Sequence, residues 1–156
     1  MQNSPNKLIP ASTVLAVRDR NDGIEVFMVV RHHQIDFASG ALVFPGGKVD
    51  KNDLNSKIRD HIISEQNLSD EELSYRIAAI RECYEEGNVL FACDENNSEI
   101  LSDGKLAKLT TWREKFNNRQ GSMYEFAVRE KLKFTVDNLI PFAHWITCLL
   151  YTSPSP

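Results

Sequence analysis

The chain has 156 residues, of which 42% are hydrophobic and 26% are charged, and its formal net charge at pH 7 is -4. This length and composition are typical of a single soluble globular domain. The acidic balance provides no basic patch for a nucleic-acid backbone, which argues against free DNA or RNA as the main partner.

Three cysteines, Cys83, Cys93 and Cys148, are odd in number and form no C-x-x-C pair. They indicate neither a zinc site nor a complete disulfide framework, and a reducing cytosol fits them best. Residues 1–10 are polar and lack the apolar core of a signal peptide, and no apolar run approaches the roughly 18 residues of a membrane helix. We therefore expect a cytoplasmic protein with no membrane partner, a flexible segment at 1–10 and one domain at 11–147.

The first predicted elements are two strands at 12–17 and 24–30, both rich in Val, Ile and Phe. Between them stands Asn21-Asp22-Gly23, which is a strong turn signal. The two strands should therefore form an antiparallel hairpin.

A further short buried strand is predicted at 40–44, where Pro45 stops it. The following Gly46-Gly47 frees the backbone for an unusual turn, which is a suitable place for chemistry. Residues 48–68 are mostly polar, with only a weak helical segment at 56–65, and are interpreted as an excursion over the surface.

A capping box predicts the start of the clearest helix, because Ser69 can cap the N-terminus while Glu72 reaches back. The helix should end at Gly87-Asn88, since both residues tolerate the left-handed conformation. Apolar residues spaced by four, three and four predict one buried stripe, formed by Leu73, Ile77, Ile80 and Tyr84.

The rest of the chain alternates between short elements. A strand is predicted at 89–92, followed by a polar loop, helices at 105–118 and 123–132, and a buried strand at 139–147. The alternation of strands and helices places the domain in the α/β class.

Three carboxylates of the predicted helix, Glu82, Glu85 and Glu86, fall within one sector, because residues three and four apart are neighbours on a helix surface. Like charges repel, so a hard divalent cation such as Mg²⁺ or Mn²⁺ is the natural partner. A solvated Glu-rich face is the alternative. Arg81 beside the cluster and the upstream Pro-Gly-Gly favour the metal site.

These residues resemble the Nudix box, which runs glycine, five residues, glutamate, seven residues, Arg-Glu-x-x-Glu-Glu-x-Gly and an aliphatic residue. The resemblance implies an α/β/α sandwich with a mixed sheet, and attack of water on a diphosphate. It implies that the glutamates and the Gly47 carbonyl bind the metal, while Arg81 organises the carboxylates at the catalytic helix. The matching positions are Gly47, Arg81, Glu82, Glu85, Glu86 and Val89.

The chain departs from this box at three places. Asp53 stands at the first glutamate position, and this shorter carboxylate is expected to pair with Arg81. Between these two residues lie 27 others where the simple box has seven, which is an insertion of 20, placed at about 54–68. The order Gly87-Asn88 reverses the usual x-Gly. None of these departures removes a metal ligand.

The insertion and the surrounding motifs are similar to one branch of the superfamily. Gly40 to Asp50, the Arg-Glu-Cys-Tyr-Glu-Glu helix and the later Pro141 to Thr147 resemble the peroxisomal enzymes that cleave coenzyme A and acyl-coenzyme A. The resemblance implies a small-molecule substrate containing a nucleoside diphosphate. NADH and ADP-ribose are alternative substrates, and a nucleotide-binding module without turnover is an alternative function.

Substrate contacts are predicted at Arg31, Gly46 and Gly47, because a guanidinium can pair two phosphate oxygens and the glycines border the metal site. For Arg31 an ordinary surface role is equally compatible. Isolated histidines and aromatics are more often structural, which is the interpretation adopted for His32, His33, His144, Trp112, Tyr124, Phe126 and Trp145. An isomerase acting on isopentenyl diphosphate shares this fold, but no cysteine stands near the glycine loop.

The end of the chain departs from its relatives. After His144-Trp145-Ile146-Thr147 the resembling sequences continue with proline and a further segment, whereas residues 148–156 read Cys-Leu-Leu-Tyr-Thr-Ser-Pro-Ser-Pro. We expect a domain that lacks its C-terminal elements and ends on a non-native tail, as read-through from an incomplete gene would produce. A natural short tail is the alternative.

Overall fold

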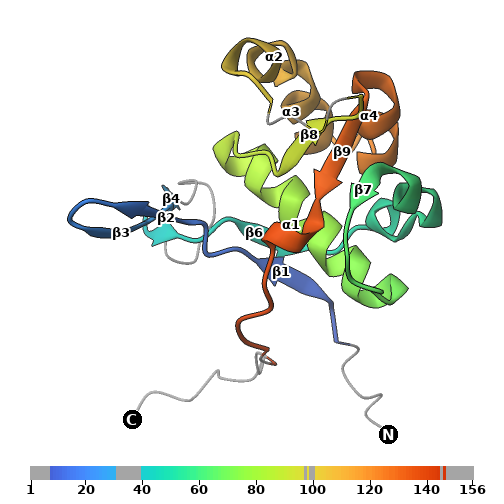
Figure 1. Ribbon diagram of the computed structural model, residues 1–156. Helices are drawn as coiled ribbons and strands as arrows, with labels where there is room; N and C mark the ends of the chain where they lie inside the picture. The colour runs from blue at the N-terminus through green and yellow to red at the C-terminus, as the bar shows by residue number, and fades with distance from the viewer. Residues whose placement is uncertain (1–7, 31–39, 97, 99–100, 145, 147–156) are drawn as a thin grey trace, which may run out of the picture.

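The structure of the protein, a computed structural model, describes residues 8–30, 40–96, 98, 101–144 and 146 (Figure 1). Predictions made for the rest of the chain lie outside these residues. They concern the segment 1–7, Arg31, His32, His33, Trp145, Thr147 and the tail 148–156.

The long helix α1, Asp70–Gly87, organises the fold. Its predicted N-terminus is confirmed by two hydrogen bonds. The Ser69 hydroxyl accepts from the Glu72 N–H, and the Glu72 carboxylate accepts from the Ser69 N–H. Asn88 ends it in the left-handed conformation, at φ 55°. The predicted stripe of Leu73, Ile77, Ile80 and Tyr84 is buried. Figure 1 shows α1 between the strands β1 and β6 and the helical half of the molecule.

The N-terminal strands form three antiparallel pairs. β1 (Ala11–Thr13) pairs with β6 (Gly46–Lys48), β2 (Val17–Arg20) with β3 (Gly23–Val26), and β4 (Val29–Val30) with β5 (Leu42–Val43). The hairpin is confirmed around its turn, but its strands are 17–20 and 23–26, because residues 11–13 pair with the glycine segment instead.

Two details of the predicted glycine region are wrong. The strand before Pro45 is short and its Leu42 side chain is 63% exposed, so it is not a buried strand. Gly46-Gly47 is not a turn, because both residues lie in β6. A strand forms here because Ser12 and Thr13 of β1 supply the hydrogen-bonding partners.

A three-stranded mixed sheet lies in the other half of the molecule. β9 (Leu132–Thr135) is central, with β7 (Ile62–Ile63) parallel to it and β8 (Ala92–Asp94) antiparallel. The strand predicted at 89–92 is therefore displaced toward the C-terminus. The helix predicted to reach Leu132 ends earlier, because Lys131 adopts a left-handed φ of 53° and the chain continues as β9.

The segment 48–68 is more than a surface excursion. It forms two 3₁₀ helices, η1 (Lys51–Leu54) and η2 (Ser56–His61), before β7. Ile58 and Leu68 are 2% and 6% exposed and belong to the main hydrophobic core. The weak helix predicted at 56–65 is a 3₁₀ helix, and it ends at His61. Burial of its few apolar residues anchors the insertion.

Three short helices cover the core, namely α2 (Asp103–Lys108), α3 (Thr110–Asn117) and α4 (Met123–Glu130). They confirm the two predicted helical regions, with a break at Leu109. A last 3₁₀ turn, η3, spans Val136–Asn138. The core they enclose is rich in aromatic rings, contributed by Tyr84, Trp112, Phe116, Phe126 and Phe134.

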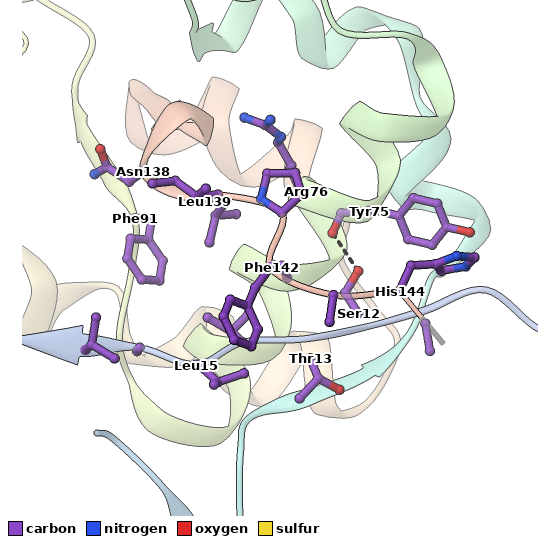
Figure 2. Close-up of a pocket in the computed structure, with 18 of the residues that line it drawn as sticks. Ser12, Thr13, Leu15, Tyr75, Arg76, Phe91, Asn138, Leu139, Phe142 and His144 are labelled. Atoms are coloured by element: carbon purple, nitrogen blue, oxygen red, sulfur yellow. Dashed lines mark hydrogen bonds between the residues drawn. The ribbon is translucent and has the colours of Figure 1, made fainter. Parts of the chain in front are cut away.

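The buried strand predicted at 139–147 is wrong for the described residues 139–144 and 146, which have no regular secondary structure. Ile140 and Phe142 are 83% and 85% exposed. Figure 2 shows Leu139, Phe142 and His144 of this segment beside an apolar groove, facing Leu15 and Tyr75. The strand does not form because no neighbouring strand among the described residues pairs with it.

Within the described part of the chain, no helix is both long and apolar enough to cross a bilayer.

The Tyr84 hydroxyl donates to the buried Leu109 carbonyl at 2.6 Å and ties α1 to the start of α3. Replacing Tyr84 with Phe removes this bond, although the Leu109 carbonyl still accepts from the Trp112 N–H, so the free energy of unfolding should fall by about 0.5–1.5 kcal/mol. Urea denaturation measures the change. Tyr75→Phe, on a partly exposed position of the same helix, is the matched control, and equal losses in both variants would contradict the assignment.

Candidate active site

The side chain of Arg81 is the centre of the site. It is 12% exposed, and its Nη1 donates to Glu82 Oε1 at 2.8 Å and to Glu85 Oε1 at 2.9 Å. Its Nε and Nη2 contact Asp53 at 3.1 and 3.0 Å. Nη2 also donates to the Lys48 carbonyl at 2.9 Å. One guanidinium therefore joins α1, η1 and β6.

Asp53 is delivered to Arg81 by a local turn. Its side chain is 1% exposed and accepts from the Asp50 N–H at 2.7 Å, while Asp50 caps η1 in return. The chain thus places a carboxylate 28 positions before Arg81 in direct contact with it. The inserted residues follow Asp53 in the chain, so they lengthen the loop without separating Asp53 from Arg81.

The two glycines of β6 are required by close approach. A Cβ on Gly47 would overlap the Glu82 carboxylate, and one on Gly46 would overlap the Ser12 carbonyl oxygen. The Gly46 N–H donates to Glu86 Oε2 at 3.1 Å. A side chain at position 46 would disturb the pairing of β6 with β1, and one at position 47 would displace the Glu82 carboxylate. The strand therefore lies directly against the glutamates.

The reversed Gly87-Asn88 order also has a steric explanation. A Cβ on Gly87 would overlap the ring of Phe27, so the glycine is used for packing. Asn88 then takes the left-handed position, and its N–H caps the Cys83 and Tyr84 carbonyls. The reversed order therefore gives the packing role to Gly87 and the left-handed capping role to Asn88, and the helix still ends at the same place.

The electrostatics of the cluster are unbalanced. Burial raises the pKa of Glu82 and of Glu85, although Arg81 opposes the shift in both. Burial also disfavours the charge on Arg81, but its bonds to Asp53 keep the pKa of Arg81 above its ordinary value. One guanidinium does not neutralise the neighbouring carboxylates, so the site favours a further cation.

Comparison with known proteins agrees with this arrangement. No protein-family model matches the chain. It is 25% identical over 158 residues to the acyl-coenzyme A diphosphatase NUDT19 of Xenopus laevis, covering 79% of this chain and 42% of that protein. A Nudix hydrolase structure from Alicyclobacillus acidocaldarius matches with a TM-score of 0.56 and 22% identity, over 85% of this chain and 59% of that one.

The chain has the fold of a Nudix hydrolase. The predicted α/β fold with a mixed sheet is thereby confirmed. The chain spans less than half the length of the curated relative that it matches. The solved structure establishes the fold, and the activity of this chain has to be argued from its site.

Nudix hydrolases generally use divalent metal ions, and the donors here suit such an ion. They are oxygen atoms in a site with excess negative charge. Among the described residues, however, no three His, Cys, Asp or Glu side chains stand together as a metal-binding group. Arg81 donates to the Oε1 atoms of both Glu82 and Glu85. Binding of an ion would use the other carboxylate oxygens.

One contact to α1 has no signal in the sequence. Arg113 of α3 donates from Nη2 to the Glu85 carbonyl at 2.8 Å and from Nε at 3.2 Å. It satisfies a carbonyl in the last turn of α1 and fixes α3 against it. The residues are 28 positions apart and belong to different predicted elements, so neither spacing nor composition indicates the contact.

The remaining candidates lie outside the carboxylate cluster. His144 borders the apolar groove of Figure 2. Trp112 and Phe126 are 2% and 0% exposed, in agreement with their core interpretation, and Tyr124 packs edge-on against His61. Cys83 is buried, and burial raises the pKa of its thiol to about 12, so it stays protonated at neutral pH.

Breaking the Arg81–Asp53 pair should destabilise the protein strongly. In Asp53→Asn the volume is kept but a nearly buried guanidinium loses its charged partner, which should cost about 3 kcal/mol in the free energy of unfolding. Asp60→Asn, at an exposed position of η2, is the control and should be nearly neutral. A loss in Asp53→Asn as small as in the control would show that the pair has no structural role.

The pKa shift of Glu82 gives a pH dependence. Because its folded pKa is raised, ionising it costs the folded state stability as pH rises through that pKa. With chelator present, Glu82→Gln should therefore gain more stability relative to the unmodified protein at pH 7 than at pH 4. Denaturant titrations at both pH values measure this difference. Glu114→Gln, exposed on α3, is the control, and a gain that is larger at pH 4 would contradict the shift.

Proposed function

We propose that this chain is a metal-dependent hydrolase that cleaves the phosphoanhydride of a nucleoside diphosphate linked to another moiety, with coenzyme A or acyl-coenzyme A as substrate. The observation that supports it most directly is the contact of β6 with the catalytic helix. Gly47 lies against Glu82, and the Gly46 N–H binds Glu86. A solvated glutamate face would have no need of two glycines pressed against it.

In this proposal Mg²⁺ or Mn²⁺ is held by Glu82, Glu85, Glu86 and the Gly47 carbonyl. The ion, when bound, neutralises diphosphate oxygens and activates water. Residues of the chain position the metal ligands. Arg81 orients the carboxylates of Glu82 and Glu85 through ion pairs, and Asp53 orients the Arg81 guanidinium in the same way. Gly46 and Gly47 let the phosphate approach the backbone of β6. The identity of the general base is not assigned.

The choice of substrate rests on the named relative and on the insertion. The matched relative is an acyl-coenzyme A diphosphatase. The insertion in the box also resembles that branch of the superfamily. NADH and ADP-ribose contain the same phosphoanhydride and are the alternative substrates. A protein of this kind acts on a small molecule and needs neither nucleic acid nor a membrane.

Two rival functions fit the site less well. A nucleotide-binding module without turnover has no need to keep Glu82 and Glu85 partly buried and raised in pKa, since this arrangement costs stability. An isomerase acting on isopentenyl diphosphate would need a reactive cysteine. The buried thiol of Cys83, with its pKa of about 12, cannot supply a thiolate at neutral pH.

A substrate panel tests the proposal. With Mg²⁺ or Mn²⁺, the chain should release a nucleoside monophosphate from coenzyme A faster than from NADH or ADP-ribose. Glu85→Gln should lower kcat by about 10²-fold or more, the scale for losing one electrostatic contact in a transition state. Glu114→Gln should leave kcat unchanged. Metal-dependent binding without hydrolysis of any of the three would support the binding module instead.

A further inference from the structure

A second feature of the site is a cleft that opens directly beside the carboxylates. Its walls come from η1, from the Arg81 to Glu85 turn of α1 and from the chain between α3 and α4, and its volume is about 790 Å³. Small-molecule sites commonly enclose about 300–1,000 Å³, so a nucleoside diphosphate fits this space. We call it the η1 cleft.

Three cations from separate elements line this cleft: Lys48 at the end of β6, Lys51 in η1 and Arg119 after α3. All three are exposed, and among the described residues none of them takes part in an ion pair. Arg81 also reaches the cleft, but its charge is already committed to Asp53, Glu82 and Glu85. The uncommitted positive charge therefore lines the same cleft as the Glu82 and Glu85 carboxylates.

The backbone of Arg119 is held in an unusual conformation. Its φ is 55°, a region that residues other than glycine seldom adopt, and its N–H donates to the Phe116 carbonyl at 2.8 Å. The next turn is equally constrained, because the Gln120 N–H donates to the Lys115 carbonyl at 2.8 Å. Gly121 packs on the ring of Trp112, where a Cβ would lie 3.3 Å from it. The aromatic core thus fixes the position of Arg119 at the rim.

We propose that the η1 cleft binds the phosphates of the substrate, with Arg119 as the main phosphate contact and Lys51 as a second one. This inference rests on the proposed function, because the Glu82 and Glu85 carboxylates alone would repel a diphosphate. A guanidinium can bind two phosphate oxygens at once, which suits it to orient the anhydride toward the carboxylates. The apolar groove of Figure 2 offers no comparable set of uncommitted cations next to Glu82 and Glu85.

Binding of ADP with Mg²⁺, measured by titration calorimetry, tests the cleft without requiring turnover. Arg119→Gln should raise the Kd for ADP by about tenfold or more, as expected for loss of one charge-assisted contact. Arg119→Lys and Lys51→Gln should each raise the Kd for ADP by less than Arg119→Gln does. The matched controls are Arg129→Gln on the exposed face of α4 and Lys57→Gln in η2. Thermal unfolding of each variant shows that the fold is intact.

The outcomes separate the cleft from the activity. If the unmodified protein does not bind ADP, or if Arg119→Gln and Arg129→Gln bind it equally, the proposal for the cleft is overturned. If ADP binding depends on Arg119 while no substrate is hydrolysed, the cleft stands and the hydrolase proposal fails. Where a substrate is turned over, Arg119→Gln should raise its KM and leave kcat nearly unchanged, because the contact is present in both ground and transition states.

Discussion

The whole site depends on one buried guanidinium. Arg81 contacts three carboxylates and one backbone carbonyl, supplied by α1, η1 and β6, and each contact satisfies a group that would be costly to bury alone. Removing water from these charges is expensive, so the arrangement persists only because almost every donor of the guanidinium has a partner. Arg81 therefore fixes where the carboxylates stand as well as how β6 and the insertion meet the helix.

The second constraint is steric and acts at the other side of Glu82. Gly47 allows β6 to lie against Glu82 of α1, and Gly46 allows β6 to lie close to Ser12 and Thr13 of β1, which pairs with it. The glycines are thus used for contact distance rather than for a turn. This difference matters for function, because an extended backbone aligns its N–H and carbonyl groups beside the glutamates, whereas a turn would direct them elsewhere.

Local signals predicted α1 well, and non-local pairing explains most of the errors. The capping contacts of Ser69, Glu72 and Asn88 join residues only a few positions apart, so their pattern is visible in the sequence. The pairing of β1 with β6, the burial of Ile58 and the contact of Arg113 with Glu85 join distant segments. Nor does an apolar composition at 139–146 make a strand, because a strand needs a partner edge. The Nudix resemblance supplied the site residues, which spacing alone would have left as a glutamate cluster.

The site must satisfy opposite electrostatic demands within a short distance. The carboxylates of Glu82 and Glu85 are under-neutralised and suited to a cation, while the substrate of a diphosphatase is an anion that they repel. The fold separates the two demands by assigning them to different elements. α1 carries the negative charge with Arg81 committed to it, and the rims formed by β6, η1 and the turn after α3 carry Lys48, Lys51 and Arg119. A divalent cation held by Glu82 and Glu85 would supply positive charge to the substrate phosphates. On this view the 3₁₀ turn that delivers Asp53 to Arg81 also presents Lys51 to the cleft, so the turn just before the insertion serves structure and binding together.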